Sequence, residues 1–492
     1  MQHVSINIIA IWTQRIVNVL VPLFSIPLIA QTYGIEQLAI WLLVLQLSSH
    51  LGLLNLGLNN SLVRFLAKPA FEGDKEELSK ILSTTLITLT GLGGFCLLFL
   101  FLLPHLTFDL AFNINSYMAI ALVFIAVGMP FQVGYGMLAA SKNFALIATA
   151  NIVSQLAWLI LLVLYAHVIS VKLITLVFIY FLIFFIKDFV LVFVGSHKLH
   201  KPIINFHYFS RISLRSILSL SLAAVILSAS AIIIRQGGSL WAGMFFDLKL
   251  VTFISLPLMA VFGVAPFINV LSQIIKPTAS IKNKIQKLTE LKSEIITSAK
   301  YTMLFATLIL IVFLNASDQL FYLWLGSTLP INEIDLIIDY FFYVFYFYLI
   351  MSPSILFRSV LVVIGKHWQT TFYEATCNII GFIVGIFITL YFTFDATGII
   401  FGVCLAFFMR AIGLNQHLIR MHFKITLFEL LKKVYAFPIL IIFVHWCFGL
   451  ALFHLPDSFQ IIETAKFITI LLFFIMSVEK VHLNKVARKI KM

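Results

Sequence analysis

Residues 173–195 of this chain read LITLVFIYFLIFFIKDFVLVFVG. Lys187 and Asp188 are the only charged side chains in this stretch. A helix of about 20 apolar residues is long enough to cross the hydrocarbon core of a bilayer. The stretch therefore predicts a transmembrane helix that carries two charges inside the membrane.

The rest of the chain has the same character. Of its 492 residues, 61% are hydrophobic and 11% are charged, against about 25% charged in an average soluble domain. A globule of this size cannot bury so much apolar surface, which excludes a soluble enzyme. The apolar runs are continuous rather than alternating, which excludes a β-barrel. We expect an all-α polytopic membrane protein with about 14 transmembrane helices. The predicted spans are 8–31, 37–62, 81–104, 116–138, 146–166, 171–195, 216–235, 246–275, 297–317, 336–364, 372–393, 397–418, 434–453 and 461–479.

Basic residues mark one side of the membrane. With a cytoplasmic N-terminus, the inside segments hold 24 of the 33 Lys and Arg residues, whereas the outside loops hold only Lys172 and Arg235. Lys and Arg accumulate in cytoplasmic loops, so both termini are predicted to be cytoplasmic. Orientation also accounts for the net charge of +13, and no nucleic-acid partner is predicted. The inside segments are 66–80, 139–145, 196–215, 276–300, 365–371, 419–433 and 480–492.

The two halves of the chain resemble each other. Ser141-Lys142-Asn143-Phe144 after the fourth span matches Gly365-Lys366-His367-Trp368 after the tenth, 224 residues later. Lys187 in the sixth span is matched by Arg410 in the twelfth, 223 residues later. Such parallel repeats are related by a pseudo-twofold axis along the membrane normal, with the substrate path between them. The predicted domains are a six-helix bundle at 1–195, a basic cytoplasmic linker at 196–215, a second six-helix bundle at 216–418, and two additional helices with a basic tail at 419–492.

Charged residues inside the predicted spans are the candidate site residues, because an ionisable group in a membrane is costly unless it has a function or a partner. The bases are candidates for binding substrate in a cavity, although those at the outer ends of the seventh and eighth spans could also reach lipid headgroups. The acids are candidates for ion coupling, because burial disfavours a charged carboxylate. The cavity cations are Arg15, Lys187, Arg358, Arg410, Arg235 and Lys249, and the ion-coupling acids are Asp188, Glu374 and Asp247.

Two interpretations of these charges stay open. In one, each charge pairs with a neighbouring helix and only holds the bundle together. In the other, they form a cavity whose excess of bases suits an anionic substrate, such as a phosphate or an acidic sugar, better than a cationic drug. Lys187 and Asp188 are adjacent in sequence, so they do not share a helix face and are not expected to neutralise each other.

Other motifs concern packing and chemistry. Residues 340–348 read YFFYVFYFY, which favours an interfacial aromatic belt over a stacking surface for sugars or an isoprenoid tail. Gly381-xxx-Gly385 and Gly398-xxx-Gly402 could let the eleventh and twelfth spans pack closely. We find no Walker A, GxSxG or HExxH motif, no metal-ligand spacing and no cofactor motif, so neither a catalytic site nor a cofactor is predicted.

The first two spans contain five short motifs, IPLIA at 26–30, YG at 33–34, IW at 40–41, LLNLGL at 53–58 and LVRFLA at 62–67. Together they resemble the N-terminal hairpin of the polysaccharide-exporter flippases. These are the O-antigen, Wzx-type branch of the multidrug/oligosaccharidyl-lipid/polysaccharide exporter superfamily. The arrangement of six, six and two spans is compatible with that superfamily over the whole chain.

The resemblance implies a function. It implies a flippase that moves an undecaprenyl-diphosphate-linked oligosaccharide from the inner to the outer leaflet of a bacterial inner membrane by alternating access. A polysaccharide polymerase and a chain-length regulator are the candidate protein partners. The absence of an ATP motif, together with the buried acids, suggests coupling to an ion gradient. The second half departs from the family at Arg235-Gln236-Gly237-Gly238-Ser239, where many relatives carry an acidic residue.

Three alternatives remain open. A lipid-linked peptidoglycan-precursor flippase of the same superfamily would also favour fourteen spans and a cationic cavity. A drug/cation antiporter would need acidic groups inside. An integral-membrane polysaccharide polymerase or glycosyltransferase would need catalytic residues on a sizeable extramembrane segment, and no predicted outside loop exceeds about 20 residues.

Overall fold

Helices make up nearly all of the described chain. The computed structural model describes residues 2–51, 62, 65–66, 69–102, 114–167, 171–199, 205–269, 272, 275, 288–393 and 395–452. No β-strand occurs among these residues, and ten of their helices are long and apolar enough to cross a membrane. The predicted all-α polytopic architecture is therefore confirmed. Each of the first thirteen predicted spans coincides at least in part with helix, and the fourteenth, at 461–479, lies outside the described residues.

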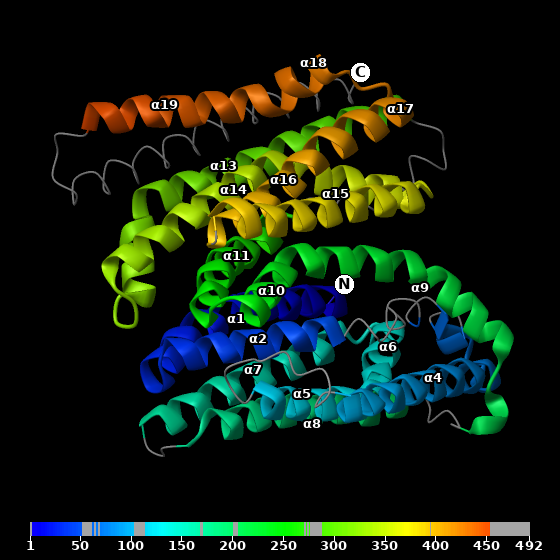
Figure 1. The fold of residues 1–492 in the computed structure, drawn as a ribbon. Coiled ribbons are helices and arrows are strands. Elements are labelled where there is room, and N and C mark those ends of the chain that lie inside the picture. Colours follow the sequence, from blue (N-terminus) through cyan, green and yellow to red (C-terminus); the bar gives the residue numbers. More distant parts are fainter. Residues whose placement is uncertain are drawn as a thin grey trace.

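Figure 1 shows most of the first half of the chain, in blue to teal, below the second half, in green to orange, while α9 of the second half runs down beside α4. The first half contains α1 (Gln2–Tyr33), α2 (Ile35–Leu51), α4 (Lys75–Leu102), α5 (Ile114–Gly128), η3 (Met129–Gln132), α6 (Val133–Ala140), α7 (Phe144–His167) and α8 (Leu173–Lys198). The second half contains α9 (Arg211–Ile232), η5 (Ile233–Gly237), α10 (Gly238–Phe245), α11 (Leu248–Ile268), α13 (Leu288–Leu325), α14 (Ile331–Val363), α15 (His367–Ile388), η6 (Thr389–Thr393), α16 (Ala396–Ile412) and η7 (Gly413–Leu418). Two short pieces are attached to these halves, η4 (Phe206–Tyr208) before α9, and the run α17 (Ile419–Phe423), α18 (Leu427–Leu430), η8 (Leu431–Tyr435) and α19 (Ala436–Leu452) after η7.

Helices pack in corresponding pairs within the two halves. In the first half, α1 packs against α7, α2 and α4 pack against α5, and α8 packs against α5, α6 and α7. In the second half, α9 and η5 pack against α15, α11 and α13 pack against α14, and α16 packs against α14 and α15. The same arrangement of neighbours is thus built twice, as an internal repeat predicts.

Two turns show the register of this repeat. Between α6 and α7, the N–H of Asn143 donates to the carbonyl five residues back at 2.9 Å, and Lys142 has a left-handed φ of 61°. Between α14 and α15, the N–H of Lys366 donates to the carbonyl five residues back at 2.9 Å, and Gly365 has a φ of 88°. These are the same helix-ending motif. Equivalent residues are 223 apart, so the sequence match at 224 was shifted by one residue.

The seventh span extends further than predicted. It was expected to end at 235, but the helix continues from α9 through the π-helical turn η5 into α10 and ends at Phe245. The polar run at 235–239 interrupts the apolar pattern, but its small residues are packed. A Cβ added to Gly238 would lie 2.3 Å from Ile399 Cγ2 on α16. Arg235 therefore lies inside a continuous helical segment rather than in an outside loop, which corrects the prediction.

The two halves are joined through α2, which packs against α10 and α11. Gln46 Nε2 on α2 donates to Ser255 Oγ on α11 at 2.8 Å, and Ser239 Oγ on α10 donates to Gln46 Oε1 at 2.6 Å. All three side chains are buried. Buried polar groups are costly unless they are bonded, so these contacts stabilise the halves in this particular arrangement.

Candidate functional site

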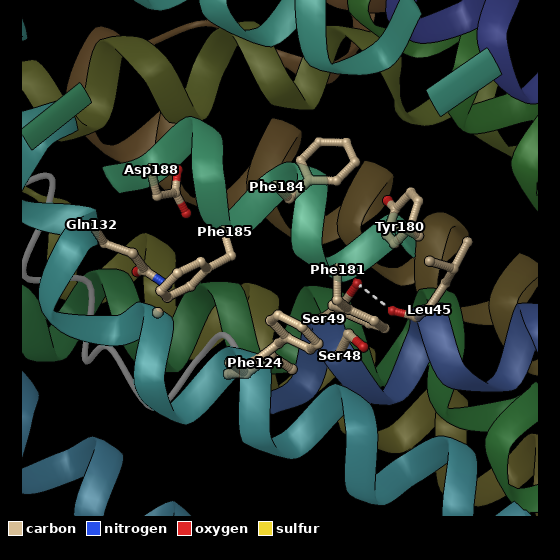
Figure 2. A pocket seen from close by; sticks show the side chains of 12 residues that line it. Leu45, Ser48, Ser49, Phe124, Gln132, Tyr180, Phe181, Phe184, Phe185 and Asp188 are labelled. Atoms are coloured by element: carbon tan, nitrogen blue, oxygen red, sulfur yellow. Dashed lines mark hydrogen bonds between the residues drawn. The ribbon is translucent and has the colours of Figure 1, made fainter. Parts of the chain in front are cut away.

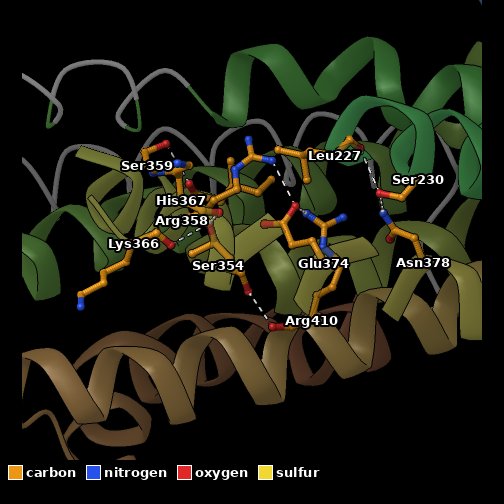
Figure 3. A network of polar contacts seen from close by, with 12 residues as sticks. Leu227, Ser230, Ser354, Arg358, Ser359, Lys366, His367, Glu374, Asn378 and Arg410 are labelled. Carbon is orange, nitrogen blue, oxygen red and sulfur yellow. Dashed lines mark hydrogen bonds and ion pairs between the residues drawn. The ribbon is translucent and has the colours of Figure 1, made fainter. Parts of the chain in front are cut away.

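Three predicted site residues meet in the second half. Arg358 on α14 and Arg410 on α16 approach Glu374 on α15 from two sides (Figure 3). Arg358 Nη1 lies 3.1 Å and Arg410 Nη2 lies 3.0 Å from the same oxygen, Glu374 Oε2. The structure therefore brings these residues together as an arginine–glutamate–arginine cluster, and each arginine has the neighbouring-helix partner that the structural interpretation requires.

Close packing of α15 on α16 places this cluster. Glu374 shares the buried face of α15 with Gly381 and Gly385. A Cβ on Gly381 would lie 2.5 Å from the carbonyl oxygen of Gly402 on α16, and one on Gly402 would lie 2.3 Å from that of Gly381. The glycine motifs thus allow the backbones to touch, which brings the acid of one helix beside the base of the next.

The cluster is buried but not fully satisfied. The side chain of Glu374 is 1% exposed, that of Arg410 is 9% exposed and that of Arg358 is 29% exposed. Glu374 Oε1 and Arg410 Nε have no hydrogen-bond partner among the described residues. Arg358 therefore provides the accessible side of the cluster, and both the acid and Arg410 keep unused hydrogen-bonding capacity.

A third arginine lies close by. Arg235 on η5 is exposed, and its guanidinium lies 4.3 Å from the centre of the Phe262 ring on α11. Phe262 packs edge-to-face on Tyr348 of α14, which is within electrostatic range of Arg235, Arg358 and Arg410. Arg235 has no acidic partner among the described residues. The cluster therefore has two bases for one carboxylate, and Arg235 adds a third positive charge on η5, which packs against α15.

The first half contains a neutral counterpart of this cluster. Lys187 on α8 donates to Asn151 Oδ1 on α7 at 3.3 Å. Asn151 lies 223 residues before Glu374, and Lys187 lies 223 residues before Arg410. This spacing is the register of the repeat. An amide thus stands where the second half has a carboxylate, so this equivalent pair of helices makes the same contact with a different charge.

Lys187 also pairs with its neighbour. Its Nζ lies 3.0 Å from Asp188 Oδ1, so the prediction that these two residues do not neutralise each other was wrong. The Cβ atoms do point apart, but four flexible methylenes let the lysine ammonium curl back.

Asp188 borders a cavity of about 270 Å³ between α2, α5 and α8 (Figure 2). Asp188 is its only acidic lining residue, and aromatic rings supply much of the wall. Such a chamber can hold a small cation or a proton beside the carboxylate, which keeps Asp188 a candidate for ion coupling. The lining consists of Leu45, Ser48, Ser49, Phe124, Ile125, Gly128, Gln132, Tyr180, Phe181, Phe184, Phe185 and Asp188.

The remaining predicted residues lie elsewhere. Arg15 on α1 is half-buried, 5.3 Å from the ring of Trp12, with no acidic partner among the described residues. Asp247 is exposed and caps α11 by accepting from Lys249 N at 3.1 Å. Lys249 is also exposed, 3.8 Å from Glu333. The structure therefore places Asp247 and Lys249 at a helix end, outside the buried cluster, because Asp247 starts a helix rather than lying within one.

Sequence reasoning missed Tyr348, Phe262 and Asn151. Tyr348 belongs to the aromatic run that we interpreted as an interfacial belt, yet Tyr340, Phe341, Phe345 and Tyr348 are buried. The belt interpretation is wrong for this face, because the i, i+4, i+8 spacing of the run turns one stripe of rings inward. The repeat register at 223 would have identified Asn151.

No group of three His, Cys, Asp or Glu residues that could hold a metal occurs in the described part of the chain. The site consists of arginines, a glutamate and aromatic rings.

Known structures share this fold. The lipid II flippase MurJ, in an inward closed conformation, has a TM-score of 0.67 at 16% identity, over 96% of this chain and 97% of that chain. An inward-facing multidrug resistance MATE family transporter of the MOP superfamily has a TM-score of 0.63 at 16% identity. The match covers 81% of this chain and 92% of that chain. The chain has the fold of the MOP-superfamily transporters.

A third MOP transporter, from Pyrococcus furiosus, is described as having a binding pocket of reverse polarity. It has a TM-score of 0.58 at 15% identity, over 83% of this chain and 93% of that one. No protein-family model matches the sequence, and no curated protein matches it. The Wzx-type resemblance is therefore supported as far as the superfamily fold.

Proposed function

We propose that this protein is a flippase for an undecaprenyl-diphosphate-linked oligosaccharide, an O-antigen or related polysaccharide repeat unit. It would move this lipid from the inner to the outer leaflet of a bacterial inner membrane, with both termini in the cytoplasm. The observation that carries the proposal is the pairing of two arginines, Arg358 and Arg410, with the single carboxylate of Glu374, with Arg235 on the neighbouring η5.

The chemistry of the substrate suits this site. A diphosphate offers several anionic oxygens, and arginine binds such groups with two parallel hydrogen bonds. Arg235 has no acidic partner among the described residues, and Arg358 is partly accessible, so both could receive the substrate. The isoprenoid tail would stay in the bilayer while the two halves rock against each other. An ion gradient would drive the cycle through Asp188 and Glu374, and a polymerase and a chain-length regulator would act on the product.

Complementation tests the proposal. The gene is expressed in a bacterium that lacks its own O-unit flippase, and surface polysaccharide is scored. We expect rescue by the wild type and loss of rescue with Arg358→Ala and Arg410→Ala at matched expression. Lys249→Ala is the control, because that side chain is exposed at a helix end. Rescue by the two arginine variants would contradict their role in binding.

A second candidate is a lipid-linked peptidoglycan-precursor flippase. The similarity to the lipid II flippase MurJ favours it, because that match covers 96% of this chain. Both substrates carry a diphosphate on a polyprenyl chain, so the same arginines would serve either. Rescue of a strain depleted of its lipid II flippase, without rescue of the O-unit flippase mutant, would select this candidate.

A further inference from the structure

We infer that Glu374 is an exchangeable counter-anion. An anionic oxygen of the bound substrate replaces the Glu374 carboxylate between Arg358 and Arg410, and the displaced Glu374 takes up one proton. This inference rests on the proposed function, because it assumes a substrate that carries a diphosphate.

The geometry favours exchange over a permanent bridge. Both arginines contact a single oxygen, Glu374 Oε2, at 3.0 and 3.1 Å, while Oε1 has no partner among the described residues. Arg410 Nε is also unpartnered there. A carboxylate that served only to satisfy two guanidinium groups would use both oxygens, in the bidentate pairing that arginine prefers. The cluster is therefore less completely bonded than a diphosphate could make it.

Access to the cluster comes from one side. Arg358 is 29% exposed, whereas Glu374 is 1% exposed. An incoming anion therefore meets Arg358 first and reaches Arg410 by displacing the acid between them. A diphosphate carries more charge and more acceptor oxygens than a carboxylate, so it is the stronger partner for two arginines.

Among the described residues, Glu374 contacts no cation other than Arg358 and Arg410, and the nearby Arg235 faces the ring of Phe262 instead. An unpaired charge in a buried position is costly, and the group takes a proton instead. The proton comes from water, no covalent bond is broken, and Glu374 returns the proton when the anion leaves and the arginines close on it again. The charged and titratable groups on the packed elements are Arg358 on α14, Arg410 on α16, Cys377 on α15, Arg235 on η5, which faces Phe262, and Tyr348 on α14, which is bonded to Asn269.

The internal repeat gives a reason to expect this coupling of anion binding to proton uptake in the second half alone. The position equivalent to Glu374 is Asn151, which can accept from Lys187 but cannot take up a proton. Anion binding and proton uptake are therefore linked at one of the two pseudo-symmetric positions.

The test counts protons during binding. Full-length protein in detergent is titrated with farnesyl diphosphate, a soluble prenyl diphosphate, by calorimetry in buffers of different ionisation enthalpy between about pH 6 and 8. We expect the wild type to take up about one proton more per bound probe than Glu374→Gln does. As pH rises, the affinity of the wild type for the probe should fall by up to about tenfold per pH unit relative to that variant. The ionisation of the probe is the same in both titrations and cancels. Glu76→Gln, which changes an exposed acid on α4 in the same way, is the control and should behave as the wild type.

The outcomes separate the inference from the proposed function. Equal proton uptake by the wild type and Glu374→Gln, with both binding the probe, overturns the exchange and leaves the flippase proposal intact. Failure of both to bind overturns the flippase proposal as well. If Glu374→Gln does not fold, infrared spectroscopy of the wild type decides: the C=O stretch of a newly protonated carboxyl must appear when the probe is added, and its absence overturns the inference.

Discussion

Arg410 and Lys187 occupy equivalent positions, 223 residues apart, but they hold their charges differently. Arg410 donates to a buried carboxylate on the next helix, whereas Lys187 donates to an amide and to Asp188, whose side chain is 26% exposed. The side chain of Asp188 is thus partly accessible, and that of Glu374 is fully buried. Removing Arg410 should therefore lower the free energy of unfolding more than removing Lys187 does.

Arg410→Leu should lower the free energy of unfolding by about 3 kcal/mol, because it leaves Glu374 buried with only Arg358 as a partner. Lys187→Leu, the matched variant, should lower the free energy of unfolding clearly less. The measurement is denaturant or thermal unfolding of the purified protein in detergent. The double variant Arg410→Leu/Glu374→Leu should recover part of the loss, and equal losses for both single variants would contradict the assignment.

Among the elements, α15 and α16 show how small residues determine a charged site. A Cβ on Gly402 would lie 2.3 Å from the carbonyl oxygen of Gly381 and 2.7 Å from Gly385 Cα, so the backbones can approach only because these positions lack side chains. Separating the helices would also separate Glu374 from Arg410.

Gly402→Val should therefore destabilise the protein by about 1–3 kcal/mol through overpacking, and under the proposed function it should also weaken binding of prenyl diphosphate. Gly91→Ala is the control, because nothing lies within 4 Å of a Cβ at Gly91 on α4. Unfolding of both variants in detergent gives the comparison. A Gly402→Val protein as stable as Gly91→Ala would show that the helices can move apart freely.

A second link between elements is sensitive to acid. Glu429 on α18 accepts from Lys433 at 2.8 Å and lies 2.9 Å from Lys292 on α13. The hydrogen bonds from Lys433 and Lys292 hold the pKa of Glu429 below its ordinary value. A lowered pKa means that the folded state favours the carboxylate, so this stabilisation is complete above the ordinary glutamate pKa and is lost as pH falls through the lowered one.

Amide exchange should therefore speed up at 419–435 when pH is lowered through this range, after correction for the intrinsic pH dependence of exchange. Glu429→Gln should show the faster exchange already at neutral pH, and high salt should act in the same direction, since both charged partners are partly exposed. Exchange that is unchanged in Glu429→Gln would mean that α18 is held to α13 by apolar contacts alone.

For the whole molecule, the sequence predicted what depends on local composition. The helices and the charged residues within them follow from residue type and spacing, and the sequence match after the fourth span gave the repeat register to within one residue. The partners were not predictable, because Arg358, Glu374 and Arg410 lie 16 and 36 residues apart and meet only after three helices pack. Arg235 was predicted in an outside loop because a polar run ends the apolar pattern there. The helix nevertheless continues through that run. Lys187 was misjudged because the rule for helix faces describes Cβ directions, not the reach of a long side chain.

The arrangement of the two halves depends on a small polar contact. Gln46 is bonded to both Ser239 and Ser255 across the join between the halves, and these bonds exist only while α2, α10 and α11 stay together. In the rocking cycle of the proposed function, this contact would break in the other conformation, where water can satisfy the same groups. The contact therefore biases the protein toward the conformation described here.

Gln46→Ala should shift the population toward the conformation in which this join is open. The measurement is the rate of thiol labelling of a cysteine at Leu43, a residue of α2 that is 3% exposed and faces Gly243 on α10. We expect faster labelling of Leu43→Cys in the Gln46→Ala protein than in the otherwise wild-type protein, because the buried hydrogen bonds no longer oppose separation. A cysteine at Ala306, which is 0% exposed on α13, reports general loosening and should label equally slowly in both backgrounds. Equal labelling at position 43 would mean that apolar packing between α2 and α11 holds the halves together without help from Gln46.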